Sequence, residues 1–398
     1  MTSPEDASPS ASLAPETALV TSGRDTLAQN GFINPPVVHG STVLYPSARD
    51  LRDHRGEYQY GRLGTPTTKA LQQALMALEG PQCAGVGLAP SGVAAITTAL
   101  LAVLKAGDHL LVSDSAYRPT RNFCDGVLKR FGVETTYFDP LIGADIEKLF
   151  QANTRAVMVE APGSQSFEMP DIPAIAAVAH AKGALVLDDN TWATPLYRRA
   201  LEQGVDISIQ AATKYIGGHS DVMFGTISAN AATWPLISQA TYLLGVCAGP
   251  DDVYMALRGL RSLAVRLAHH QKAGLEIAEF LAQRPEVLRV IHPARADHPG
   301  HTIWKRDFKG ATGLFSVVLK PVPEKAVDAM LDTLKLFGMG YSWGGFESLV
   351  IPFDCSDYRT ATQWNPGGPA LRFHVGVENI DDLKADLDAG FAALKAAS

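Results

Sequence analysis

Three short segments of the chain combine residue types that could do chemistry. Lys214 follows the apolar run 206–209 and precedes a glycine pair, a setting in which a lysine amine can be desolvated and act as a nucleophile. Asp189 follows the apolar run 184–187 and could face a positive group. The segment 85–92 reads as a glycine-rich turn that opens a helix, where free N–H groups favour an anion such as phosphate.

Each segment also has a plain structural interpretation. A serine such as Ser91 often caps a helix, acidic residues after a strand often cap the next element, and a lysine there is usually solvated. The glycine spacing is not G-x-G-x-x-G and the chain holds no G-x-x-x-x-G-K-[ST], which disfavours a nicotinamide oxidoreductase and a P-loop NTPase. His219 and His374 lack a second ligand at i+4 or a cysteine partner, so no metal is predicted.

The apolar pattern predicts the elements that must position these segments. Strand-like runs alternate mostly with helix-length stretches, which is typical of an α/β layer sandwich with a mainly parallel sheet. A helix is predicted from Thr65-Pro66 to Gly80, a second over 93–105, and one long amphipathic stretch over 251–283. The predicted strands of the sheet are 109–112, 135–138, 156–159, 184–187 and 206–209. A smaller unit follows, with strands at 314–319 and 371–377 and helices at 324–336 and 381–394.

Ligands of an open α/β sheet lie beyond the carboxyl ends of its strands, so the three segments meet at one edge. There they supply a phosphate cradle, a carboxylate and an amine. Pyridoxal 5′-phosphate (PLP) needs this set: a lysine that bonds to its aldehyde, a carboxylate that keeps its pyridine nitrogen protonated, and a phosphate anchor. The residues therefore predict PLP as the cofactor.

The segments D-N-T-W at 189–192 and A-T-K-Y-x-x-G-H-x-D at 212–221 resemble the signature of the Cys/Met-metabolism family of PLP enzymes. The resemblance implies an aspartate-aminotransferase-like fold, with a mainly parallel seven-stranded sheet in a large domain and a smaller α/β C-terminal domain. Many members carry a serine two residues before Thr213, where this chain has Ala211. One phosphate hydroxyl is therefore missing, and Thr213 is left to bind that side of the phosphate.

The resemblance also assigns roles to individual residues. Without it, Tyr117 is equally well a core aromatic, and Arg372 equally well faces solvent. The cofactor-binding residues that it implies are Lys214, Asp189, Thr213, Ser91, Gly92, Val93, Tyr117, Tyr60 and Arg62, with Tyr60 and Arg62 reaching the cofactor phosphate of a neighbouring subunit. The implied catalytic residues are Lys214, Tyr117 and Tyr60, and the implied substrate-carboxylate site is Arg372 with Ser342 and Trp343.

Two further segments bear on the reaction. Trp192 and the run S-W-G-G at 342–345 most resemble the members that cleave L-cystathionine and related cysteine S-conjugates at the Cβ–S bond, in methionine biosynthesis and transsulfuration. Such a carbon–sulfur β-lyase releases homocysteine, pyruvate and ammonia. The alternatives are a γ-acting member, such as a cystathionine γ-synthase, an O-acylhomoserine sulfhydrylase or a methionine γ-lyase, and a non-catalytic regulator that keeps the PLP fold.

Composition and organisation limit the partners. The net charge is −7 with no basic stripe and no apolar run of membrane-spanning length, so we expect an amino-acid substrate and neither nucleic acid nor a membrane as partner. Four scattered cysteines and an N-terminus without a signal predict a cytoplasmic protein. The predicted divisions are a disordered tail (1–16), an N-terminal arm (17–64), a PLP-binding domain (65–258) and a C-terminal domain (259–398). The resemblance implies a homo-oligomer, a tetramer built from two dimers.

Overall fold

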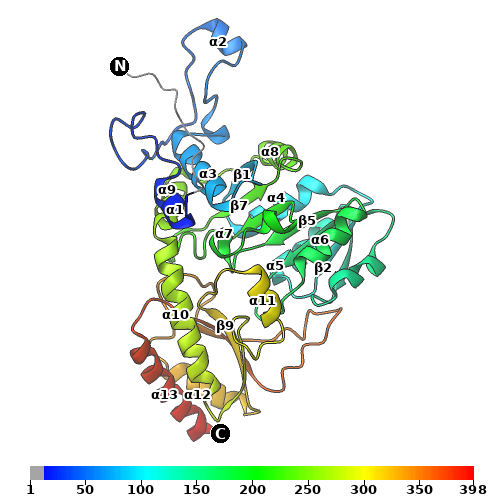
Figure 1. The fold of residues 1–398 in the computed structure, drawn as a ribbon, viewed down its shortest axis with the longest axis vertical. Helices are drawn as coiled ribbons and strands as arrows, with labels where there is room; N and C mark the ends of the chain where they lie inside the picture. Colours follow the sequence, from blue (N-terminus) through cyan, green and yellow to red (C-terminus); the bar gives the residue numbers. More distant parts are fainter. Residues whose placement is uncertain (1–12) are drawn as a thin grey trace.

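A computed structural model describes residues 13–398 of the chain (Figure 1). Most of the predicted tail, residues 1–12, lies outside the described residues. The tail prediction is wrong at its end, because Pro15 begins the short helix α1 (Pro15–Thr21). The arm that follows is largely irregular and carries α2 (Ala48–Arg52), which projects away from the rest of the molecule at the top of Figure 1.

A seven-stranded sheet forms the centre of the larger part, in the order β1-β7-β6-β5-β4-β2-β3. Only β7 runs antiparallel to its neighbours, so the predicted mainly parallel sheet is confirmed. The strands are β1 (Gly85–Ala89), β2 (His109–Ser113), β3 (Glu134–Phe138), β4 (Thr154–Glu160), β5 (Leu185–Asp189), β6 (Ile207–Gln210) and β7 (Gly225–Ala229).

The prediction of a turn over 85–92 is wrong for its first five residues, which form β1. Glycines weaken a strand, but here the neighbouring helix α8 (Trp234–Leu243) requires one. A Cβ added to Gly85 would lie 2.2 Å from the indole of Trp234. Close packing of α8 on β1 therefore explains a glycine in a strand.

Helices cover both faces of this sheet. One face packs against α3 (Pro66–Glu79) and α6 (Ile172–Ala181), and the other against α4 (Gly92–Val103). The start and stop predicted for α3 are confirmed, since Thr65 caps its first turn and Gly80 ends it. The short helices of this part are α5 (Arg118–Phe123) and α7 (Thr194–Tyr197).

The stretch predicted as one helix over 251–283 is two, α9 (Pro250–Arg261) and α10 (Leu263–Ala282), separated at Ser262. Figure 1 shows α10 running from the large sheet down to the smaller unit. The predicted domain boundary at 258/259 lies within α9 and stays a prediction.

The smaller unit is an antiparallel four-stranded sheet in the order β10-β11-β9-β8. Buried apolar side chains join it to α10 and to the two helices at the bottom of Figure 1, α12 and α13. Its elements are β8 (Val287–Ile291), α11 (His301–Asp307), β9 (Leu314–Leu319), α12 (Glu324–Thr333), β10 (Leu349–Phe353), β11 (Ala370–His374) and α13 (Ile380–Ala397). Of these, β8, α11 and β10 are absent from the predictions.

A buried carboxylate fastens the loop between β10 and β11 to the large sheet. Asp114, which directly follows β2, accepts hydrogen bonds from the backbone N–H groups of Thr360, Ala361 and Thr362, at 3.1, 3.1 and 2.8 Å. The hydroxyl of Thr362 donates a fourth, and Arg121 of α5 forms an ion pair with the same carboxylate. This connection lies beside the turn that carries Tyr117.

Candidate active site

One cavity of about 360 Å³ collects most of the predicted site residues. It lies where the carboxyl ends of the large sheet meet the small unit. The predicted residues that line it are Ser91, Gly92, Val93, Tyr117, Asp189, Thr213, Lys214, Ser342, Trp343 and Arg372. The predicted residues Tyr60 and Arg62 do not line it.

Lys214 lies in the turn after β6 and is the only amine among the side chains that line this cavity. Its Nζ donates a hydrogen bond to Ser342 Oγ at 2.7 Å and lies 5.4 Å from the centre of the Trp343 ring. Burial, and next the nearby Arg372 guanidinium, lower the pKa of Lys214 to about 8, while the Asp189 carboxylate opposes the shift. At pH 7 a minor fraction of this amine is therefore neutral and nucleophilic, but a far larger one than for an unperturbed lysine.

Asp189 ends β5 and is 7% exposed. One carboxylate oxygen accepts hydrogen bonds from the N–H and the hydroxyl of Thr191, which fixes its orientation. Burial raises the pKa of Asp189, and the Thr191 bonds and the Lys214 charge oppose that rise. A cationic ring nitrogen placed at this carboxylate would stabilise its ionised form.

The N-terminus of α4 provides a site for an anion. Ser91 caps the helix by accepting from Ala94 N at 3.0 Å, which leaves the N–H groups of Gly92 and Val93 free of helical partners. Thr213 also lines the cavity, but its hydroxyl already bonds with the backbone N–H and C=O of Phe224. Phosphate contact by Thr213 stays a prediction.

Arg372 and Tyr117 both line the cavity, so Arg372 is not a solvent-facing residue and Tyr117 is not a core aromatic. Arg372, in β11, is 9% exposed and donates to the carbonyl oxygen of Ser342 at 2.9 Å, so it does not face solvent. Burial lowers its pKa to about 10. Tyr117 is 41% exposed at the cavity wall and is therefore not a core aromatic.

Glu160 is a cavity residue that the sequence predictions missed. It ends β4, pairs in register with Asp189 of β5, and accepts from Tyr117 N at 2.6 Å. Burial and the neighbouring Asp189 raise its pKa well above the usual range of a glutamate. Its position offers a signal, because Glu160 directly follows the predicted strand 156–159, and Asp188 and Asp189 follow the predicted strand 184–187 in the same way.

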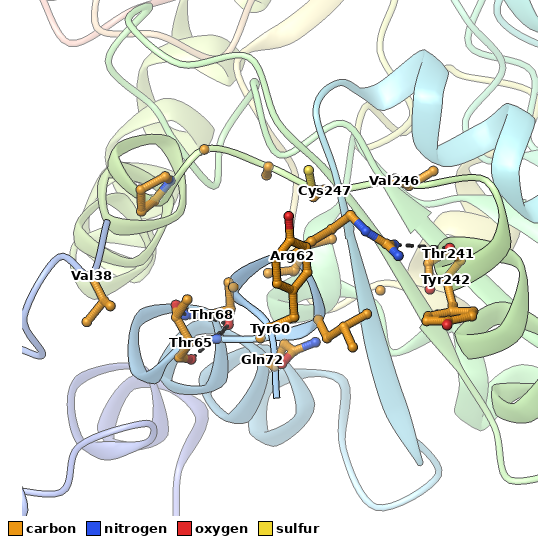
Figure 2. Close-up of a pocket in the computed structure, with 18 of the residues that line it drawn as sticks. Val38, Tyr60, Arg62, Thr65, Thr68, Gln72, Thr241, Tyr242, Val246 and Cys247 are labelled. Carbon is orange, nitrogen blue, oxygen red and sulfur yellow. Dashed lines mark hydrogen bonds between the residues drawn. The ribbon is translucent and has the colours of Figure 1, made fainter. Parts of the chain in front are cut away.

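The arm residues Tyr60 and Arg62 line a separate cavity of about 590 Å³ between the arm and α8. Figure 2 labels both residues at this cavity, where Arg62 Nη1 donates a hydrogen bond to the carbonyl oxygen of Tyr242 at 3.0 Å. Tyr60 is 47% exposed. Within this one chain, neither residue lines the cavity of Lys214.

A lysine amine, an orienting carboxylate, a helix N-terminus with two free N–H groups and an arginine lie in one cavity and fit the functional groups of PLP. The comparisons agree. The profile of the Cys/Met metabolism PLP-dependent enzymes matches residues 16–392. A protein of Rhizobium johnstonii is 54% identical over 384 residues, which cover 96% of each chain.

Two named relatives support the same grouping. Cystathionine beta-lyase of Escherichia coli is 44% identical over 391 residues, covering 95% of this chain and 98% of that protein. The solved structure of cystathionine gamma synthase from Xanthomonas oryzae pv. oryzae superimposes with a TM-score of 0.89 at 31% identity, over 97% of this chain and 100% of that one. The chain belongs to the Cys/Met metabolism PLP-dependent enzymes.

Proposed function

We propose that this chain is a PLP-dependent carbon–sulfur β-lyase that cleaves L-cystathionine to homocysteine, pyruvate and ammonia. The observation that carries the proposal is the convergence of Lys214, Asp189 and Arg372 on one cavity. The 44% identity to the Escherichia coli cystathionine beta-lyase supports the choice of substrate. Related cysteine S-conjugates share the reacting atoms and belong to the same substrate class.

Each residue has a part in this reaction. Arg372 binds the α-carboxylate in a bidentate manner and so fixes which Cα bond faces Lys214. When bound, PLP supplies an electron sink for the pair left on Cα, and Asp189 holds its ring nitrogen protonated. Tyr117 packs against the ring, while the α4 N-terminus and Thr213 hold the phosphate.

Proton movement at Lys214 connects the two bond cleavages. The Nζ amine removes the Cα proton, and the Cβ–S bond then breaks with its electron pair leaving on sulfur. Lys214, or a tyrosine beside it, returns a proton to the sulfur to give homocysteine. Water hydrolyses the remaining three-carbon enamine to pyruvate and ammonia, so that cystathionine plus one water balances the three products.

Product analysis tests the reaction. Purified enzyme incubated with L-cystathionine should release pyruvate and homocysteine in equal amounts. Release of 2-oxobutyrate and cysteine would instead assign γ-lyase chemistry, a possibility kept in view by the structural likeness to a cystathionine gamma synthase. A protein that binds PLP and yields neither keto acid would support the non-catalytic regulator.

Removal of the lysine tests the chemical role. Lys214→Ala should lose pyruvate release and the absorbance band of lysine-bound cofactor, while Lys148→Ala, a surface lysine paired with Asp145, should keep both. Borohydride reduction followed by mass spectrometry should find the pyridoxyl group on Lys214. A pyridoxyl group on another residue would contradict the assignment.

We also propose a homotetramer in which the arm completes the site of a neighbouring subunit. Tyr60 and Arg62 lie outside their own chain's Lys214 cavity, and the arm exposes apolar side chains such as Leu27 at 93% and Leu44 at 88%. A chain that carries only Arg62→Ala and a chain that carries only Lys214→Ala are each expected to be inactive. Refolded together, they should regain about a quarter of wild-type activity, because half of the randomly paired dimers are mixed and each mixed dimer holds one intact site of its two. No recovery would contradict exchange of the arm.

Among residues 13–398, no helix is both long enough and apolar enough to cross a bilayer. We propose a cytoplasmic enzyme on the basis of its amino-acid substrate and its four unpaired cysteines. Cell fractionation that recovers the protein outside the cytoplasm would contradict this location.

A further inference from the structure

The turn Ser342–Gly345 connects the two cations of the cavity. The Ser342 hydroxyl accepts from Lys214 Nζ at 2.7 Å, and the carbonyl oxygen of the same residue accepts from Arg372 Nη2 at 2.9 Å. Ser342 and Gly344 both have positive φ, +90° and +85°. Glycine adopts this conformation freely, but at Ser342 it is strained and persists only when its surroundings hold it in place.

The far side of this turn presses directly on the chain that carries the lysine. A Cβ added to Gly344 would lie 2.9 Å from the backbone carbon of Lys214 and 2.9 Å from the backbone nitrogen of Tyr215. A displacement of the turn would therefore change the position of Ser342 Oγ relative to the amine. It would also move the carbonyl oxygen that orients Arg372.

One imidazole supports the base of the turn. His374 Nε2 lies 3.1 Å from Gly344 N and 3.2 Å from Gly345 O. A neutral ring accepts from Gly344 N–H in one tautomer and donates to Gly345 O in the other, so either tautomer bonds to the turn. His374 is in β11, two residues after Arg372, and side chains at this spacing share one face of a strand.

The ring of His374 is enclosed and uncharged. It is 1% exposed, and the rings of His270 and Tyr215 lie 5.2 and 5.9 Å from it, centre to centre. His270 is itself fixed by a 2.8 Å bond from its Nδ1 to the carbonyl oxygen of Val375. Burial, with His270 beside it, lowers the pKa of His374 to about 3, so the ring remains neutral where the enzyme works.

We propose that His374 is a positioning residue, whose Nε2 edge holds the Ser342–Gly345 turn against Lys214 and thereby sets both the Ser342–Lys214 hydrogen bond and the alignment of Arg372. The inference rests on the roles proposed above for Lys214 and Arg372. His374 touches neither side chain directly and acts through the turn between them.

Three substitutions separate the polar edge from the volume of the ring. His374→Gln carries an amide group to the Nε2 position, His374→Asn carries the same group only as far as Nδ1, and His374→Phe keeps a ring without polar atoms. We expect His374→Gln to retain kcat/KM within about threefold. His374→Asn and His374→Phe should lose about 10- to 100-fold in kcat/KM, the scale that small misplacements of reacting groups produce.

Two spectroscopic readouts distinguish positioning from a general loss of folding, and neither needs carbon–sulfur cleavage. The pH midpoint of the absorbance band of lysine-bound cofactor should shift in His374→Asn and His374→Phe, since the Ser342 contact to Lys214 changes. The dissociation constant for glycine, which offers Arg372 a carboxylate but carries no sulfur, should rise in the same two variants. Thermal unfolding identifies any variant that fails to fold.

The outcomes are decisive in both directions. The proposal would be overturned if folded His374→Asn and His374→Phe kept the wild-type kcat/KM, pH midpoint and glycine affinity. It would also be overturned if His374→Gln were impaired as strongly as His374→Phe. If the wild-type enzyme released no pyruvate, the midpoint and glycine measurements would still test His374 while the β-lyase assignment failed on its own.

Discussion

Asp188 and Asp189 are neighbours in β5, but their carboxyl groups lie on opposite faces of the seven-stranded sheet. Asp189 lines the cavity on the α4 side, in register with Glu160 and Ile209. Asp188 faces the α3 side, where Arg198 Nη2 lies 2.5 Å from its Oδ2 and neither side chain is exposed. Strand alternation alone separates the two residues.

The comparison shows how one pair of acids acquires two different surroundings. Burial raises the pKa of both, but Asp188 has a permanent cationic partner whereas Asp189 faces a lysine across a cavity that a ligand can enter. On the α3 side, Ser208 of β6 is paired with Asp188 of β5, and the Ser208 hydroxyl donates a hydrogen bond to Glu79 Oε1 of α3 at 3.3 Å. One face therefore holds a closed polar layer and the other an open site.

The largest expected effect comes from Asp189→Asn. Loss of the charge opposite the cofactor's ring nitrogen should lower kcat by on the order of 10³-fold, as removal of a preorganised electrostatic group does. The unfolding free energy should not fall, because a buried charge is removed. Asp188→Asn is the matched control, and its activity per folded enzyme should remain, because this carboxyl group lies on the opposite face of the sheet from the cavity. Equal losses of activity in Asp189→Asn and Asp188→Asn would contradict the different roles assigned to the two faces of the sheet.

Arg198→Met tests the closed layer. Removing one partner leaves the Asp188 carboxyl buried without its cation, which should lower the free energy of unfolding by about 3–5 kcal/mol in denaturant titrations at pH 8. The pKa of Asp188 is already raised to about 6, so the loss should be smaller at pH 5, where that carboxyl is protonated. Lys148→Met, which breaks an exposed pair with Asp145, should cost less than about 1 kcal/mol. A similar small loss in Arg198→Met would contradict the buried role.

Glu79→Gln should stabilise the protein, with a sign set by pH. Burial raises the pKa of Glu79 from 4.5 to about 7, so the native state binds the proton more tightly than the unfolded chain. The stability that this proton confers is full below about pH 4.5 and is lost as pH rises through 7. At pH 8 the variant should therefore gain roughly 3 kcal/mol, at about 1.4 kcal/mol per pKa unit. Thermal scans that show the gain at pH 4.5 instead would contradict this sign.

The smallest expected effect concerns the charge balance on the open face. Arg372→Met removes a cation that lowers the pKa of Lys214, so the midpoint for loading PLP into the apoenzyme should move upward from about 8. It should remain below 10.5, because burial is the larger cause and persists. Stopped-flow absorbance across a pH series measures the midpoint, and a downward shift would contradict the assigned direction.

The sequence predicts the parallel strands well because their apolar runs are continuous, as in β2 and β4. It misses β1, where glycines that make room for α8 weaken the strand pattern, and β7, whose Thr and Ser residues look like a loop. The single long helix fails at Ser262, where periodicity continues although the backbone breaks between α9 and α10. Periodicity reports which side chains are buried and does not locate a break in the backbone.

The site residues on strand ends could be predicted because topology fixes where such ends meet. Lys214, Asp189 and Arg372 were found in this way or through the family signature, and all three line one cavity. Glu160 was missed because it lacks a motif. The support of the Ser342–Gly345 turn by His374 could not be found from sequence, since it depends on a contact between side chain and backbone across 29 or 30 positions.

The loop fastened by Asp114 has a consequence for exchange with solvent. Swinging the small sheet away from the large one would break four hydrogen bonds to a carboxylate, each worth about 1.5–3 kcal/mol, and would leave that charge without its partners. We therefore expect reactants and products to pass the exposed edge of the cavity at Met223 and Tyr341, which are 67% and 90% exposed in the single chain. On this expectation, turnover does not require the small sheet to separate from the large one.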